Sequence, residues 1–237
     1  KDLGGKLQFD LSDIARFPKT IAGPNFLIDM FVAGGFLPRI GDAGTAQDPI
    51  DGWRARLRDC RESFLFGWRA TGDPRMAWMI RAMGRMGETD AEWAKIDADA
   101  QKQSADPVLS NVTRNLPGFG MVVLEAHPEQ SDYRNKAALV LRTGCGQGHG
   151  HCDQLGIAYY AKGAQLLSDN GRRGGRTNTR SNRNHNLVEV DERDLLCTAY
   201  GRSGVGWAEA VDDLQGVGYA RASAAAPSHP YLKVYRR

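Results

Sequence analysis

Three of the chain's five histidines lie between residues 149 and 185, the region densest in groups that bind metals or transfer protons. His149 and His151 belong to the run G-H-G-H-C-D, and His185 follows later, with Asp169 between them. On a strand, His149 and His151 point to the same side, because side chains alternate between the two faces. If Asp169 ends the next strand and His185 begins another, the segments converge on one ion. Two imidazoles and one carboxylate form an ordinary zinc set with a fourth position open.

The same histidines also have a plainer interpretation. A histidine beside an apolar strand is usually a core residue whose hydrogen bonds are satisfied. Asparagines also lie in this region, at positions 170, 184 and 186, and asparagines behind a metal could fix the imidazole tautomers. By spacing alone, a zinc site and a pair of core histidines are both open.

A different enzyme class is a further alternative. His151 and Asp153 form an H-x-D pair, and His229 and Arg236 follow near the end of the chain. This order imitates the facial triad of iron- and 2-oxoglutarate-dependent oxygenases, with an arginine for the co-substrate carboxylate. It leaves three of the candidate residues without a role, namely His149, Asp169 and His185.

A cluster of arginines lies between Asp169 and His185 in the sequence. Its members, interleaved with Gly, Asn and Thr, are Arg172, Arg173, Arg176, Arg180 and Arg183. Such a run is often only a solvated loop, but guanidinium groups also bind carboxylates and sulfates in a bidentate manner. The run therefore predicts contact with an acidic polymer, for which Arg176, Arg180 and Arg183 are the candidates. No nucleic-acid-binding motif accompanies it, so a nucleic-acid partner is not expected.

The composition narrows the class of protein. Hydrophobic residues make up 41% and charged residues 25% of the 237 residues, as in ordinary globular domains. No apolar run approaches the roughly 18 residues of a membrane span, so none is expected. None of the four cysteines forms a C-x-x-C pair, which argues against a zinc ribbon.

The first part of the chain has the periodicity of helices. Apolar residues at three- and four-residue steps predict one helix over residues 53–70, and a methionine-rich stripe after Pro74 predicts a second. Thr89 and Glu92 form a capping box for a third. The methionine stripe is interpreted as core, and residues 34–51 as a long loop.

After Pro107 the pattern changes to short strands. Runs rich in aliphatic, β-branched or aromatic residues occur at 121–124, 138–141, 157–160, 187–190, 208–211 and 217–221. Lys162-Gly163 is a candidate hairpin turn. These strands predict an antiparallel sandwich. The fold class is therefore α+β, with a helical segment over 1–106 and a β-sandwich over 107–237.

The motifs also resemble a known family. The run 148–156 (GHGHCDQLG), then 166–171 (LLSDNG) and 185–191 (HNLVEVD), is similar to the heparinase II/III-like polysaccharide lyases and their alginate-lyase relatives. Their pattern reads G-H-G-H-x-D-x-L, L-L-x-D-x-G and H-N-T-V-x-V-D, and the match covers roughly residues 110–200. The resemblance implies that the helices end an (α/α) toroid and that the strands form the family's β-sandwich.

The resemblance also assigns roles. His151, Asp169 and His185 match the family's zinc ligands, with the zinc mainly structural, and His149 matches a histidine facing the substrate cleft, its catalytic candidate. The implied reaction is β-elimination in a uronate-containing polysaccharide such as alginate or a heparin-like glycosaminoglycan. A periplasmic or secreted location follows from the family as well.

The chain departs from the family pattern at one important point. Residues 1–110 contain no Tyr and no His, although the family's toroid commonly supplies both as acid and base. We therefore expect the chain to be a fragment, cut also in its sandwich, with little activity alone. The alternative is a non-catalytic module that binds a polyanion or carbohydrate.

Overall fold

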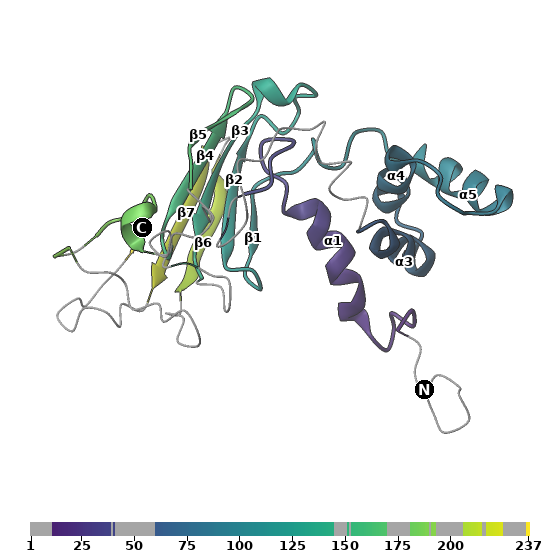
Figure 1. Cartoon of the computed structure of the whole chain (residues 1–237), viewed down its shortest axis with the longest axis horizontal. Helices are drawn as coiled ribbons and strands as arrows, with labels where there is room; N and C mark the ends of the chain where they lie inside the picture. Colours follow the sequence, from purple (N-terminus) through teal and green to yellow (C-terminus); the bar gives the residue numbers. More distant parts are fainter. Residues whose placement is uncertain are drawn as a thin grey trace. The chain divides into compact units, whose positions relative to one another are not determined.

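The computed structural model describes residues 11–38, 40, 60–144, 151, 153–169, 181–189, 191–192, 206–214, 217–224 and 236–237. The chain divides into two compact units (Figure 1), one of Lys1–Met30 with Ile50–Val108 and one of Phe31–Pro49 with Leu109–Arg237. The first is helical and the second is built of antiparallel strands, so the predicted α+β class is confirmed. Among the described residues, no helix is long and apolar enough to cross a membrane.

The helical unit consists of short helices with clear start and stop signals. Among the described residues of this unit, these are α1 (Ala22–Asp29), α3 (Arg61–Thr71), α4 (Pro74–Met83) and α5 (Asp90–Ala100), preceded by the 3-10 turn η1 (Pro18–Ile21). Gly72 ends α3 with a φ of 69°, a left-handed conformation that glycine adopts without strain. The Thr89 side chain accepts a hydrogen bond from the Glu92 backbone N–H, as the capping box predicts.

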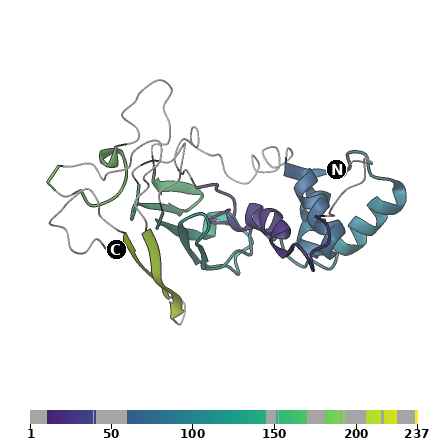
Figure 2. The same cartoon turned by 90° about the horizontal axis from the view of Figure 1, so that it is seen from below.

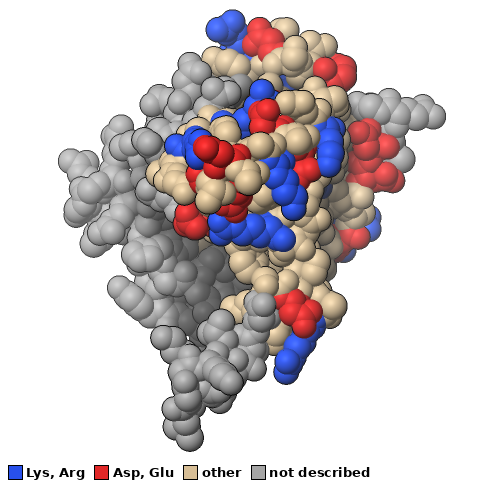
Figure 3. Space-filling view, turned by 90° about the vertical axis from the view of Figure 1, so that its right-hand side faces the viewer, with Lys and Arg blue, Asp and Glu red and all other residues tan. Residues whose placement is uncertain are grey.

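The core of this unit comes from apolar positions on each helix. Phe64, Trp68, Met76, Met79, Ile80 and Ile96 are all at most 4% exposed. The methionine stripe is thus core, as expected. Figure 3 shows basic and acidic side chains interspersed on one face of the molecule. The helical unit contains ion pairs such as Arg69–Glu92 and Arg81–Asp97, each at 2.9 Å.

The described residues of the second unit form two antiparallel sheets (Figures 1 and 2). The larger runs β1 (Arg114–Leu116), β2 (Met121–Ala126), β3 (Ala137–Arg142), β4 (Ile157–Ala161) and β5 (Ala164–Leu167), in that order. The smaller pairs β6 (Gly206–Leu214) with β7 (Val217–Ala224). Val122 and Leu141 of the first sheet cluster with Ala222 and Ala224 of the second, as in a sandwich core.

The hairpin between β4 and β5 turns at Lys162-Gly163, as predicted. Both residues have positive φ, 54° and 71°, which a two-residue type I′ turn requires. The strand expected over 187–190 is absent from its described residues, since Leu187, Val188 and Glu189 are not in a strand. The N–H of Leu187 instead bonds back to the His185 carbonyl at 3.0 Å, which keeps the chain turning after His185.

A segment that the sequence placed with the helices packs with the sheet. Val32 and Phe36 close a tight turn and join the core cluster of β2, β3 and β4. The turn is anchored by Glu125, whose two carboxyl oxygens each accept from the Ala33 N–H at 3.2 Å, and which pairs with Arg114 at 3.2 Å. The Arg114 guanidinium also donates to the Phe31 carbonyl.

Glu125 makes the stability of the sheet unit depend on pH. Burial raises the pKa of its carboxyl to about 7, against the opposing effects of Arg114, the Ala33 N–H and Lys136. Because the Glu125 carboxyl has a higher pKa in the folded protein than in the unfolded chain, the folded protein binds its proton more tightly. The resulting stabilisation is fully present below the unfolded-state pKa and is lost as the pH rises through the folded-state pKa of about 7. The free energy of unfolding should therefore fall on the order of 2–3 kcal/mol from pH 5 to pH 8.

Urea unfolding at several pH values, on the wild type and Glu125→Gln, tests this expectation. The glutamine is neutral at every pH, so the fall should shrink in that variant. Glu129→Gln, at a side chain that is 64% exposed, is the matched control and should keep the wild-type slope. Equal slopes in all three proteins would contradict the assignment to Glu125.

Candidate metal centre

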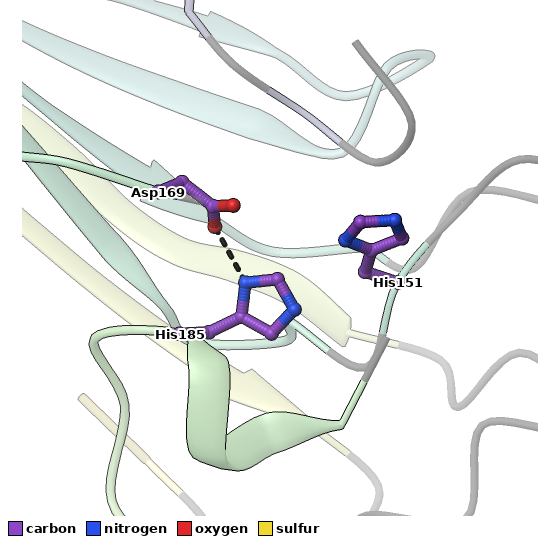
Figure 4. Close-up of side chains that lie close together, drawn as sticks. All are labelled: His151, Asp169 and His185. Atoms are coloured by element: carbon purple, nitrogen blue, oxygen red, sulfur yellow. Dashed lines mark hydrogen bonds and ion pairs between the residues drawn. The ribbon is translucent and has the colours of Figure 1, made fainter. Parts of the chain in front are cut away.

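The three predicted metal ligands are held by three segments at one place in the sheet unit (Figure 4). His151 precedes β4, Asp169 lies two residues after the end of β5, and His185 directly follows the 3-10 turn η5 (Asn182–Asn184). Ser181 is the N-cap of η5, and its hydroxyl accepts a hydrogen bond from the Arg183 N–H. Because β4 and β5 form a hairpin, Asp169 lies at the same end of these strands as His151. The turn at η5 places the His185 side chain next to both residues.

The side chains are close and buried. One potential ligand atom of each of the three residues lies within 4.8 Å of the others. The Nδ1 of His185 is 2.6 Å from the Oδ2 of Asp169, and the imidazole rings of His151 and His185 have centroids 5.2 Å apart. His151, Asp169 and His185 are 0%, 7% and 8% exposed.

This donor set fits a zinc ion. Two ligands of a tetrahedral zinc, each about 2.0–2.1 Å from the metal, are about 3.3 Å apart. The distance between Asp169 Oδ2 and His185 Nδ1, 2.6 Å, is shorter than this spacing, and the upper limit for the three ligand atoms, 4.8 Å, is longer. Side-chain shifts of about an ångström would therefore bring all three atoms to the distances that a zinc ion requires. In addition, the buried Nε2 of His185 has no hydrogen-bond partner among the described residues.

The electrostatics around His185 also suit a cation. Burial lowers the pKa of this imidazole, but its hydrogen bond to Asp169 and the charges of Asp169 and Asp153 outweigh that effect, and the net shift is upward. The same negative charges that favour a proton on His185 favour a dication. A proton and a metal therefore compete for this site.

A buried ion pair lies next to these ligands, and the sequence did not reveal it. The Oδ2 of Asp153 is 3.2 Å from the Nε of Arg142, and the two residues are 1% and 6% exposed. Burial raises the pKa of the Asp153 carboxyl, and Arg142 opposes that shift. The only signal in the sequence was the position of Asp153 two residues after His151.

The asparagine after His185 does not hold an imidazole, contrary to one expectation. The side-chain amide of Asn186 donates instead to two backbone carbonyls, those of Ile157 and Ser168.

Of the remaining candidates, only Arg183 lies in the described part of the chain. Its guanidinium is 3.0 Å from Glu189 Oε1 and donates to the Glu192 carbonyl at 2.7 Å. His149, Arg176 and Arg180 lie outside the described residues. Of the residues in the oxygenase alternative, His229 lies outside the described residues, Asp153 pairs with Arg142 at 3.2 Å, and Arg236 pairs with Glu209 at 3.0 Å.

Comparison with known proteins shows the fold. The chain is similar to the heparan sulfate lyase HepC from Pedobacter heparinus, with a TM-score of 0.55 and 14% identity over 94% of this chain. It is also similar to a heparinase III with methylated lysines, with a TM-score of 0.50 and 12% identity over 91%. The chain spans 30% and 31% of the length of these proteins. No family model and no curated protein matches the sequence. The chain therefore has the fold of part of a heparinase-like polysaccharide lyase.

Proposed function

We propose that this chain is part of a polysaccharide lyase that cleaves a uronate-containing polysaccharide by β-elimination, and that its sheet unit binds a structural zinc ion. The observation that carries the proposal is the buried set of His151, Asp169 and His185, in a chain with the fold of heparan sulfate lyases. A zinc ion held there would tie three separate segments of the sheet unit together. The protein is periplasmic or secreted in this proposal, where its polymer is accessible.

The reaction makes three demands on the protein. The carboxylate of the uronate must be neutralised to acidify the C5 proton, a base must remove that proton, and an acid must protonate the oxygen leaving C4. His149 is the proposed proton-transferring residue on the sheet side of the cleft. Arg176 and Arg180 are proposed to neutralise the carboxylate, and Arg183 would join them only by exchanging its contacts with Glu189 and Glu192.

The reaction is followed by the absorbance of its unsaturated uronate product, with heparan sulfate, heparin and alginate as substrates. The 237 residues alone should show little or no turnover, because residues 1–110 contain no Tyr and no His to act as acid and base. A positioned acid or base contributes about a hundred- to ten-thousand-fold each. A longer form extended at the N-terminus should be active.

Two controls make this experiment decisive. His149→Ala in the longer form should abolish most turnover, and a neutral glucan should not be cleaved. Rapid turnover by the 237 residues would show that no further acid or base is needed. Binding of the polymers without any product from the longer form would favour the non-catalytic alternative.

A further inference from the structure

One side chain contacts the backbone on either side of the metal centre. The amide nitrogen of Asn186 is 2.8 Å from the carbonyl oxygen of Ser168 and 3.2 Å from that of Ile157. Ser168 immediately precedes Asp169, and Ile157 is the first residue of β4, the strand that follows His151. Asn186 itself immediately follows His185. A single amide group therefore joins the three segments that carry the three ligands.

The backbone of Asn186 strengthens this connection. Its carbonyl oxygen accepts from the Ile157 N–H at 3.0 Å, so Asn186 and Ile157 are bound twice. The same carbonyl accepts from the Arg237 guanidinium at 2.9 Å. Arg237 Nη1 also donates to the Leu155 carbonyl at 3.0 Å, and the Arg237 backbone pairs with Ala222 of β7. The position of Asn186 is thus fixed from both sheets.

These hydrogen bonds act on the separation of the ligands. Asp169 and His185 are one residue away from the two ends of the Asn186–Ser168 bond, so loss of that bond would let their backbones move apart. Zinc requires ligand distances near 2.0–2.1 Å, with a tolerance of about 0.2 Å. Asn186 makes no hydrogen bond to either imidazole among its described contacts, so its influence on a metal would pass through the backbone.

We propose that Asn186 is a positioning residue for the metal centre, setting the spacing of His151, Asp169 and His185 by holding their three segments in register. This inference rests on the proposed zinc site. The inference goes beyond the proposed zinc site because it assigns part of the zinc affinity to Asn186, a side chain that is not a ligand.

Asn186→Asp is the sharpest variant. Aspartate has the same size, but its carboxylate has no N–H to donate and would face the carbonyl oxygens of Ile157 and Ser168. The matched control is Asn115→Asp, which makes the same change at an exposed asparagine of β1 in the same sheet. Asn186→Ser, which retains one donor, is a milder variant for use if Asn186→Asp does not fold.

The measurements are zinc affinity by competition with a chelator, the d–d absorption spectrum of the cobalt-substituted protein, and thermal unfolding with and without zinc. We expect Asn186→Asp to weaken zinc binding about 10- to 100-fold, as loss of a supporting contact typically does, and to alter the cobalt spectrum. Zinc should then raise the melting temperature less than it does in the wild type. Asn115→Asp should match the wild type in all three measurements.

The outcomes separate this inference from the proposal beneath it. If the wild type binds no zinc, the proposed metal site itself is wrong. If the wild type binds zinc and Asn186→Asp, or Asn186→Ser in its place, keeps the wild-type affinity and cobalt spectrum, the positioning role is overturned. A melting temperature lowered equally with and without zinc would then show a merely structural residue.

Discussion

His151→Ala and His185→Ala should each leave the purified protein with almost no zinc, whereas the wild type should hold close to one ion per chain. Each substitution removes one of the three proposed zinc ligands from a site where both imidazoles are at least nine-tenths buried. Two remaining ligands would not compete with a mild chelator. Metal analysis of protein purified without added metal and dialysed against that chelator measures the difference.

Loss of the ion should also destabilise the sheet unit. A ligand that binds only the folded state at a thousand times its dissociation constant adds about 4 kcal/mol to the free energy of unfolding. A strong chelator should therefore lower the melting temperature of the wild type and have little effect on either alanine variant. His127→Ala is the matched control, because His127 is 64% exposed and its nearest acidic partner, Glu129, is 3.7 Å away. Zinc loss in His127→Ala as complete as in His185→Ala would contradict the assignment.

The sheet was largely predictable because its signals are local. β2, β3 and β4 are short apolar runs between turn residues, and the turn at Lys162-Gly163 needs only the conformational freedom of glycine and its neighbour. The anchoring of the turn at Ala33 was not predictable. Its contact with Glu125 joins residues 92 positions apart through a backbone N–H, and no periodicity in the sequence reports such a contact.

The grouping of His151, Asp169 and His185 could be predicted from the sequence. The hydrogen bonds that hold their segments in place could not. The spacing of the motifs predicted that the three segments converge, because side chains two residues apart on a strand share a face. The structure brings Asp169 and His185 to His151. The segment after His185 looked like a strand from its apolar residues. In the structure it turns, and Asn186 holds that turn with hydrogen bonds to β4 and to Ser168. A donor that pairs with main-chain carbonyls leaves no mark in residue type or spacing.

The buried ion pair between Arg142 and Asp153 should make a large contribution to the free energy of unfolding. Arg142→Met should lower the free energy of unfolding by about 3–5 kcal/mol, because it leaves the Asp153 carboxylate buried without its partner. The guanidinium of Arg142 also donates to the carbonyls of Phe119 and Gly120, at 3.0 and 3.1 Å. The pair thereby connects the segment after His151 to the β1–β2 turn, so the loss should extend to the metal centre.

A double-mutant cycle separates the pair from its surroundings. Arg142→Met and Asp153→Asn should each be strongly destabilising, and the double variant should lose well under the sum, since neither charge is then left alone. Urea unfolding with a chelator present in every sample removes any contribution from metal. The control cycle is Arg81→Met with Asp97→Asn, an ion pair at 2.9 Å whose side chains are 48% and 38% exposed. Exposed pairs are coupled by about 0.2–1 kcal/mol. A coupling energy for Arg142 and Asp153 no larger than that would mean that burial does not strengthen this pair.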